Sequence, residues 1–452
     1  MTKKLVHIGM DDIDSPRGGC TTHFASLLVE QLSGWGVDWI DYPNLVRLNP
    51  NIPYRTRGNG AVSLRFRVKE DRISDLLPFI DRMIQEYIDL KYPNTNPGVV
   101  VLEGEIQESV RQFAMRALWK TIPLEIARRV IRESGIDSIA HGNGRGLVGA
   151  VSAIGNNLMN DFTYEYIAYR ALNKTNEQRE VDNDSVVEMD RIMGDKLFSS
   201  IDDQSGRNVI APHGPDPVLF GIRGERPDYV IEAASLVRSE QSVSRWMVFR
   251  TNQGTGAHLM NCVYISDLRP YMAAVVHGVI ESKSRILEGG HVIFGVGDCS
   301  GRIDCAAYEP TGNFRETITG LEKGDQVMIH GGVRPASRLH GLTLNAEGIE
   351  VLKLAAAPKM LNPLCPVCEK RMKSAGRDKG YKCANCGFKD PKAKKIATPA
   401  SREIEEKVYL PPIRAQRHLT RPEVRFGRRN NEVPVTLVKK WSSHLQVRKC
   451  RE

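Results

Sequence analysis

The spacing of apolar residues divides the first 140 positions into helices and strands. Apolar residues at every third or fourth position predict amphipathic helices over 24–32, 73–90 and 105–136, the last one broken at Pro123. Short runs rich in Val, Ile, Leu and Phe predict strands over 3–9, 45–48 and 61–68. Because strands alternate with helices, we expect an α/β domain over residues 1–140.

A less regular pattern covers residues 141–268. The stretch opens with a glycine-rich turn at His141, the spacing over 162–172 predicts a helix, and 216–224 is typical of a strand. This mixture indicates a small α+β domain whose topology the pattern does not define.

From residue 269 the pattern changes to short strands separated by glycine turns. Five strands are predicted, over 272–280, 291–296, 301–308, 326–331 and 342–352, with a helix between 314 and 321. This arrangement is typical of an OB-type β-barrel, which we place at 269–357.

Charge is concentrated at one end of the 452-residue chain. Residues 358–452 hold 24 Lys and Arg against 9 Asp and Glu, whereas the rest holds 39 against 45. A basic end on a mildly acidic body indicates a polyanionic partner such as nucleic acid, with a solubilising tail as the alternative. After Pro391 the chain is basic and interrupted by prolines, so we expect a tail over 396–452 that only a partner holds.

Neither a membrane span nor a secretion signal is visible in the sequence. There is no apolar run of about 18 residues, and the chain begins directly with a strand-like segment. We therefore expect a cytoplasmic protein with no membrane partner.

Two pairs of cysteines carry the spacing of a zinc site. Cys365 and Cys368 are followed after 14 residues by Cys383 and Cys386, which predicts a zinc ribbon over 358–395. Four thiolates leave no open position on the ion, so the zinc would be structural; free thiols or a redox pair are the alternatives. Lysines, arginines and two aromatic rings between and beside the pairs are typical of an RNA-binding surface.

Three carboxylates follow the first predicted strand. Asp11, Asp12 and Asp14 would repel one another unless a cation lay between them, which predicts Mg²⁺ shared with nucleotide phosphates. A solvated acidic loop is the alternative.

The residues after these carboxylates favour an anion. Gly18 and Gly19 let the backbone approach a phosphate closely, and Thr21 and Thr22 begin a helix whose free N–H groups attract one. The combination resembles neither a Walker A loop nor a dinucleotide-binding fingerprint, and a simple helix cap would explain the threonines equally well.

Further polar clusters extend this prediction. Four more residues are candidates for contacts with phosphate, with ordinary polar loops as the alternative: Arg57, Asn59, Asn143 and Arg145. Asp216 and Glu225 flank a glycine-bearing strand and would suit a cationic small molecule, unless they are a turn residue and a surface charge.

Several of these motifs together resemble the archaeal agmatinylcytidine synthetase family, which acts on the isoleucine tRNA that reads AUA. The resemblance is carried by GMDDIDSPRGGCTTHFASLL (9–28), RLNPNIPYRTRGNGAV (47–62), GNGRGLVGA (142–150), GPDPVLFGIRGE (214–225) and FRTNQGTGAHL (249–259). It spans nearly the whole chain, with the barrel and the ribbon in the family's order.

This resemblance implies a fold and a reaction. It implies a kinase-type α/β domain, a ferredoxin-like domain, an OB-fold and a zinc ribbon. It also implies ATP-dependent conjugation of agmatine to C2 of the wobble cytidine in the CAU anticodon, through a phosphorylated cytidine. By motif, Asp11, Asp12 and Asp14 would hold Mg²⁺ and ATP, and Thr21 would be a self-phosphorylated residue.

The residues alone leave two other functions possible. A non-enzymatic single-strand binder built on barrel and ribbon would explain the charge but leave residues 11–22 without a role. Another ATP-dependent RNA kinase would transfer phosphate to RNA without needing agmatine.

Overall fold

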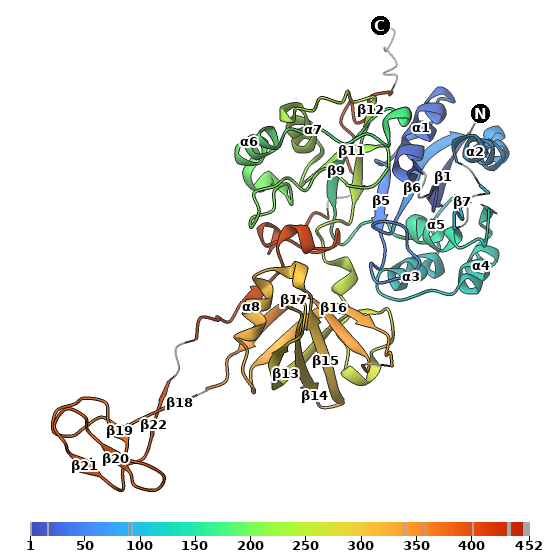
Figure 1. The fold of residues 1–452 in the computed structure, drawn as a ribbon. Helices are drawn as coiled ribbons and strands as arrows, with labels where there is room; N and C mark the ends of the chain where they lie inside the picture. Colours follow the sequence, from blue (N-terminus) through green and yellow to red (C-terminus); the bar gives the residue numbers. More distant parts are fainter. Residues whose placement is uncertain are drawn as a thin grey trace.

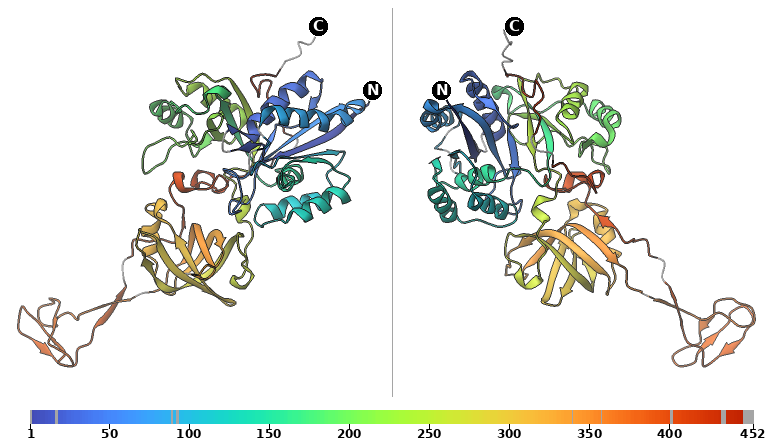
Figure 2. Two further views of the ribbon diagram at one scale, coloured as in Figure 1. Left: turned by 45° about the vertical axis from the view of Figure 1, so that its right-hand side comes forward. Right: turned by 180° about the vertical axis from the view of Figure 1, so that it is seen from behind.

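The protein is described by a computed structural model that covers residues 2–15, 18–88, 90–91, 94–338, 340–356, 358–399, 402–431 and 435–445. An upper body of two halves, blue and green in Figure 1, rests on a yellow β-barrel. A small ribbon stands at the end of a two-stranded stalk, clear of the rest in both views of Figure 2.

A single ten-stranded sheet runs through both halves of the body, in the order β10-β11-β9-β12-β5-β6-β1-β7-β8 with β4 beside β6. The first half contributes β1 (Lys3–Asp11), β4 (Asp38–Trp39), β5 (Asn44–Arg47), β6 (Gly60–Lys69), β7 (Gly98–Glu103) and β8 (Asp137–Ala140). The second contributes β9 (Thr163–Tyr169), β10 (Leu197–Phe198), β11 (Val218–Gly224) and β12 (Arg245–Thr251). The halves join where β12 pairs in parallel with β5.

Helices cover both faces of the first half, as the apolar stripes predict. On one face α1 (Thr21–Gly34) and α2 (Ile73–Tyr87) pack against Val6, Ile8 and Met10 of β1. On the other face three helices share a core with Val100 and Leu102: α3 (Glu108–Ala117), α4 (Leu124–Glu133) and α5 (Gly146–Gly155). Gly9 makes this close approach possible, since a Cβ there would lie 2.1 Å from the carbonyl oxygen of Ala150.

The second half is the α+β unit expected, with α6 (Asn183–Met193) and α7 (Pro227–Leu236) beside its strands. The helix predicted over 162–172 is wrong, because Thr163–Tyr169 form the strand β9. All seven of its residues are buried and it pairs with both β11 and β12. A central strand covered on both faces carries no alternation, so its run of apolar residues imitated a buried helix.

The β-barrel has the five predicted strands: β13 (Ala273–Ile286), β14 (Val292–Asp298), β15 (Gly301–Ala307), β16 (Gln326–Arg334) and β17 (Thr343–Lys353). A parallel pairing of β15 with β17 closes it, and the short helix α8 (Phe314–Thr319) lies where a helix is predicted. Beyond it, β18 (Pro358–Leu361) and β22 (Ile396–Pro399) form the stalk. The ribbon at its end holds β19 (Lys373–Ser374), β20 (Tyr381–Lys382) and β21 (Lys389–Asp390).

The chain after the stalk folds back onto the barrel and the body, so the expectation of a tail held only by a partner is wrong for its described residues. We call residues 402–431 the return segment. Arg402 pairs with the fully buried Asp325, Ile404 joins the barrel core, and β23 (Val408–Tyr409) extends the barrel sheet at β17. Further on, the buried Trp441 accepts a hydrogen bond from the Val248 backbone N–H.

Arginines, more than apolar side chains, attach this segment. Arg425 is fully buried, with its guanidinium 3.0 Å from Asp161 Oδ1 and 2.6 Å from Glu225 Oε1. The basic composition that suggested a free tail therefore serves in part to neutralise acidic groups inside the body.

We expect Arg425→Met to lower the free energy of unfolding by about 3 kcal/mol, because a fully buried guanidinium is lost from both carboxylates; Asp161 keeps Arg421 and Glu225 keeps a side-chain amide. Chemical denaturation measures this. Arg377→Met is the control, since that side chain is 99% exposed and its loss should cost under about 0.5 kcal/mol. Equal stability of the two variants would mean that Arg425 does not anchor the segment.

Candidate functional site

The four ribbon cysteines form the one group of metal-ligand side chains that converges among the described residues. Their sulfur atoms all lie within 4.8 Å of one another, with 3.4 Å between Cys365 and Cys386 and between Cys368 and Cys383. Four thiolates around zinc would be separated by roughly 3.8 Å, so this donor set fits the predicted structural ion.

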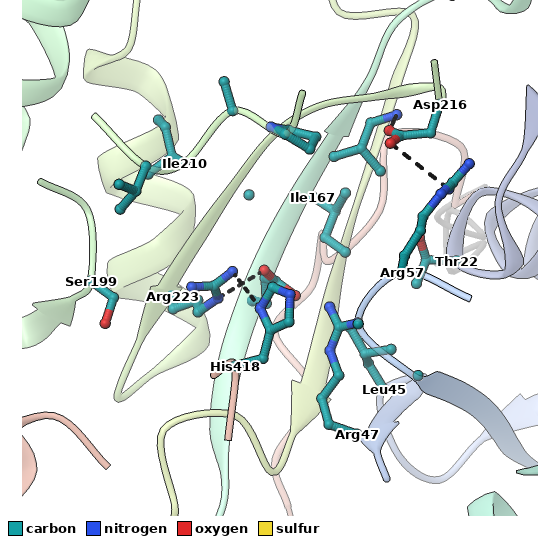
Figure 3. Close-up of a pocket in the computed structure, with 18 of the residues that line it drawn as sticks. Thr22, Leu45, Arg47, Arg57, Ile167, Ser199, Ile210, Asp216, Arg223 and His418 are labelled. Atoms are coloured by element: carbon teal, nitrogen blue, oxygen red, sulfur yellow. Dashed lines mark hydrogen bonds and ion pairs between the residues drawn. The ribbon is translucent and has the colours of Figure 1, made fainter. Parts of the chain in front are cut away.

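Two neighbouring cavities in the body collect most of the other predicted residues. The first, about 400 Å³, lies at the end of β1 and is lined by Asp11, Asp12, Asn59, Asn143 and Arg145. The second, about 460 Å³ and drawn in Figure 3, lies where the two halves meet and is lined by Asp14, Thr21, Thr22, Arg57 and Asp216. Thr56 lines both.

The first cavity places two half-buried carboxylates beside hydrogen-bond donors. Asp12 Oδ2 accepts hydrogen bonds of 3.2 Å from both the backbone N–H and the side chain of Asn96. Asp11 lies against α5, where a Cβ at Gly149 would be 1.8 Å from its carboxylate. The Asn143 backbone N–H donates to Asn96 Oδ1, which ties the glycine-rich loop to the same network.

Electrostatics in this cavity favour a bound cation. Burial, with the charge of Asp14 next, raises the pKa of Asp12 to about 7. Burial and the charge of Asp12 raise the pKa of Asp11 well above its usual range. Arg145 faces the ring of Tyr54 at 3.6 Å from its centroid and forms the basic side of the cavity.

Asp14 is separated from these two carboxylates and belongs to the second cavity. Its Oδ1 accepts a hydrogen bond of 3.3 Å from Thr56, and Arg57 lies 3.7 Å from its Oδ2. Burial still raises its pKa, because it outweighs the nearby guanidinium. The three carboxylates predicted to share one cation therefore do not form a single cluster.

Arg57 bridges the two halves across the second cavity. Its guanidinium lies 3.8 Å from Asp216 Oδ2 and donates to the carbonyl of Gly19, in the short hairpin of β2 (Asp14–Ser15) and β3 (Gly18–Gly19). Asp216 is also held by Arg179 at 2.9 Å. Figure 3 shows Arg57 and Asp216 facing each other at the upper edge of the cavity.

The start of α1 supplies hydroxyl and N–H groups to the second cavity. Thr21 and Thr22 are both buried there, and Thr21 Oγ1 accepts a hydrogen bond from the backbone N–H of Ile13. Cys20, which precedes the helix, makes no side-chain cap, so the backbone N–H groups of Thr21 and Thr22 are not occupied by a capping side chain.

Glu225 lies in neither cavity. Arg425 and Asn430 occupy its carboxylate, and the residue anchors the return segment.

Several residues of the second cavity carry no recognisable signal in the sequence. Glu165 of β9 is buried and accepts hydrogen bonds from Arg223 and Gln253. His418 reaches the cavity from the return segment and accepts a hydrogen bond of 3.1 Å from Arg223. Glu165 was hidden in a segment predicted to be helical, and His418 in one predicted to be free of the body.

Four family models match the chain in order. They are the TiaS TCKD domain over residues 7–77, the TiaS FLD domain over 144–258, an OB-fold nucleic acid binding domain over 274–352 and the TiaS C-terminal zinc ribbon domain over 362–404. Fold and site together define a multidomain nucleic-acid-binding protein whose body offers polar cavities to small charged ligands.

Similarity to known proteins over nearly the full length of the chain identifies its family. The chain is 42% identical to the isoleucine-tRNA 2-agmatinylcytidine synthetase TiaS of Staphylothermus marinus, over 96% of both chains. It also matches crystal structures of TiaS in complex with its isoleucine tRNA and ATP (36% identity, TM-score 0.82) and with this tRNA, AMPCPP and agmatine (34%, 0.80). Each match covers 93% of this chain and 97% of the other. The chain belongs to the TiaS family of isoleucine-tRNA 2-agmatinylcytidine synthetases.

In the ligand-free protein, the raised pKa of Asp12 makes stability depend on pH. The folded state keeps a proton that the unfolded chain loses near pH 4, so this contribution favours folding at low pH and is lost as pH rises through about 7. We expect Asp12→Asn to raise Tm relative to the unsubstituted protein by several degrees more at pH 8 than at pH 5.

Thermal unfolding at the two pH values measures this difference. Asp71→Asn, which replaces an exposed carboxylate, should change Tm equally at both. The same behaviour for Asp12→Asn would contradict the burial of a costly charge at residue 12.

Proposed function

We propose that this protein is an ATP-dependent ligase that conjugates agmatine to C2 of the wobble cytidine in the isoleucine tRNA with the CAU anticodon. The main structural support for this proposal is the arrangement of the two cavities. A cavity with half-buried carboxylates and a basic wall adjoins, across Thr56, a cavity with a carboxylate suited to a cation. Membership of the family adds the substrates, since relatives are named for this reaction and crystallise with the isoleucine tRNA, with ATP and with agmatine.

We assign the nucleotide phosphates to the first cavity. Asp11 and Asp12 would hold Mg²⁺, whose charge relieves the repulsion that burial imposes on them. A bound Mg²⁺ supplies positive charge to the phosphates during transfer. Asn59, Asn143 and Arg145 complete the wall and would contact phosphate oxygens or the base.

We assign the cytidine and agmatine to the second cavity. Agmatine is a dication with a four-carbon chain, which suits carboxylates beside apolar side chains. Asp216 would bind one charged end of it, and Leu45, Ile167 and Val218 would face the methylene groups. Arg57, which now pairs with Asp216, would have to move or share that carboxylate.

The reaction divides into two steps that these cavities can serve. First, the cytidine C2 oxygen takes the phosphoryl group of ATP, with ADP as the leaving group. The agmatine amine then attacks C2, the carbon–nitrogen bond forms, and the carbon–oxygen bond breaks to release phosphate. The amine loses its proton along the way, and Asp14 is the nearest unassigned carboxylate with a raised pKa.

Thr21 is the proposed site of self-phosphorylation. Its hydroxyl stands at the start of α1 and lines the second cavity, close to the carboxylates at the end of β1. The helix N-terminus would stabilise a phosphate on this residue, together with Gly18 and Gly19 of the adjoining hairpin.

The division of the chain into working parts is also a proposal. We assign phosphoryl transfer to residues 1–140, the ferredoxin-like unit to 141–268, and RNA binding to the barrel (269–357) and the ribbon (358–395). Within the part assigned as the basic tail (396–452), the return segment (402–431) runs back to the body, and its His418 lines the second cavity. Helix α5, which begins at Gly146, packs on β1 and so serves the first part.

We place the reaction in the cytoplasm, where tRNA is abundant. The eight described cysteines are all unpaired, as a reducing compartment would keep them. No helix among the described residues is long and apolar enough to cross a membrane.

A labelling assay tests the function directly. Protein, Mg²⁺-ATP and radiolabelled agmatine are incubated with the AUA-reading isoleucine tRNA transcript and with one whose wobble cytidine is replaced by uridine. We expect label in the first RNA alone, and none with Asp12→Ala. Phosphate transfer to RNA without agmatine would favour an RNA kinase, and RNA binding without ATP turnover would favour a simple binder.

Asp216→Asn tests the agmatine assignment. We expect KM for agmatine to rise about tenfold or more while KM for ATP changes less than threefold, because one charge contact to the dication is lost. Tm should be recorded alongside, since Arg179 also relies on this carboxylate. An equal rise in both KM values would make Asp216 a structural residue.

A further inference from the structure

The charged side chains that line the second cavity are paired, with one exception among the described residues. Asp14 and Asp216 face Arg57, and Glu165 faces Arg223. The two arginines from the return segment pair with acids outside the cavity, Arg414 with Asp202 and Arg417 with Glu347. The exception is Arg47, at the end of β5.

Arg47 is held firmly by its backbone and its Nε. Its backbone N–H donates to Asn252 Oδ1 at 2.8 Å, and its carbonyl accepts from Asn252 Nδ2 at 2.9 Å. Its Nε donates to Gln253 Oε1 at 3.3 Å. Within the described chain its two terminal nitrogens have no hydrogen-bond or ion-pair partner, and Figure 3 shows them directed into the cavity beside His418.

The glycines of the Gly-Asn-Gly turn make room for this guanidinium. A Cβ at Gly58 would lie 2.7 Å from Arg47 Nη1, and one at Gly60 would lie 2.9 Å from it. Gly58 and Gly60 therefore leave space for the guanidinium of Arg47. This explains both glycines without any contact between their backbone and a ligand.

The surroundings of Arg47 are poor in negative charge. Glu165 is the nearest acid that acts on it, but Arg223 and Gln253 already occupy that carboxylate. Burial, followed by the charges of three nearby arginines, lowers the pKa of the neighbouring His418 well below its usual range. Burial also lowers the pKa of Arg47, because the described residues of the second cavity do not supply a carboxylate that pairs with its guanidinium.

We propose that Arg47 binds a phosphate group in the second cavity, with first-turn N–H groups of α1 as its second source of positive charge. A guanidinium offers two parallel donors to phosphate oxygens, and an uncapped helix start favours the same ligand. Two sources could supply the group. One is the RNA diester beside the wobble nucleotide, and the other is the phosphate monoester that leaves C2; this inference rests on the proposed function.

Equilibrium binding of RNA, measured without ATP or agmatine, tests whether the bound phosphate belongs to the RNA backbone. An anticodon hairpin of the isoleucine tRNA, and the same hairpin with one neutral methylphosphonate linkage on either side of the wobble nucleotide, are titrated with the full chain. We expect Arg47→Gln to weaken binding of the natural hairpin by about 10- to 100-fold and to abolish the difference between the two hairpins. Arg47→Lys keeps the charge and should recover part of the affinity.

A second arm tests the monoester source. If hairpin affinity is unchanged by Arg47→Gln, inorganic phosphate should raise Tm of the unsubstituted protein but not of the variant. Single-turnover agmatine transfer should then fall about 10- to 100-fold with KM for agmatine within threefold. Weaker hairpin binding would identify the RNA diester as the ligand of Arg47. Loss of the response to inorganic phosphate, with slower agmatine transfer, would identify the phosphate released from C2.

Arg191→Gln, an exposed arginine on the outer helix α6, is the control and should behave as the unsubstituted protein in every arm. If Arg47→Gln changes neither hairpin affinity nor the response to inorganic phosphate, while its Tm is retained, the proposal is overturned. Failure of the unsubstituted protein to transfer agmatine would sink the proposed reaction alone, since hairpin binding is measured without ATP or agmatine.

Discussion

The parallel contact between β5 and β12 holds the rest of the body in place. Only two residue pairs make it, Arg250 with Asn44 and Thr251 with Leu45. Around it lie the buried ion pair of Arg250 with Asp41, at 2.5 Å, and the two hydrogen bonds between Asn252 and the backbone of Arg47. Because this pairing makes the strands of both halves one continuous sheet, it fixes the relative position of the two halves and with it the walls of the second cavity.

Placing reactive groups at such a joint has a physical advantage. The two halves contribute carboxylates that would repel each other if they lay side by side. Asp14 comes from the first half and Asp216 from the second, and Arg57 lies between them. Arg57 lies near both carboxylates across the joint, and Arg179 also pairs with Asp216, so both acids face a cation before any ligand arrives. In the proposed assignment, a cationic substrate would compete with this tethered guanidinium for Asp216, which would discriminate against weakly charged amines.

The sequence predicted those elements that have one apolar face. Helices α2 to α4 each bury one apolar stripe, and β13 alternates between core and solvent over residues 276–281, so their periods are visible in the residues. Strand β9 was mistaken for a helix because both of its faces are covered. The return segment was mistaken for a free tail because its anchors are arginines, whose buried partners such as Asp161 lie more than 200 positions away in the chain.

The candidate site was predictable to the extent that it is local. The carboxylates and threonines of residues 11–22 lie together in the sequence but divide between two cavities, and the glycines of this stretch form the hairpin beside them. Asp216 came from a motif and does reach the second cavity, whereas Glu225 turned out to be an anchor. No local pattern could reveal Glu165 or His418, because tertiary packing alone brings them to the same wall.

The zinc ribbon is inserted between two adjacent strands of one barrel sheet, β17 and β23, and the chain returns to the body only after it. Ribosomes make proteins from the N-terminus, so the wall that carries His418 is among the last parts to emerge. The metal-binding arm can fold while the cleft is still open on one side. A nascent chain therefore completes the barrel strands up to β17 and the metal-binding arm before the second cavity is closed, and termination before residue 402 leaves that cavity without the wall that carries His418.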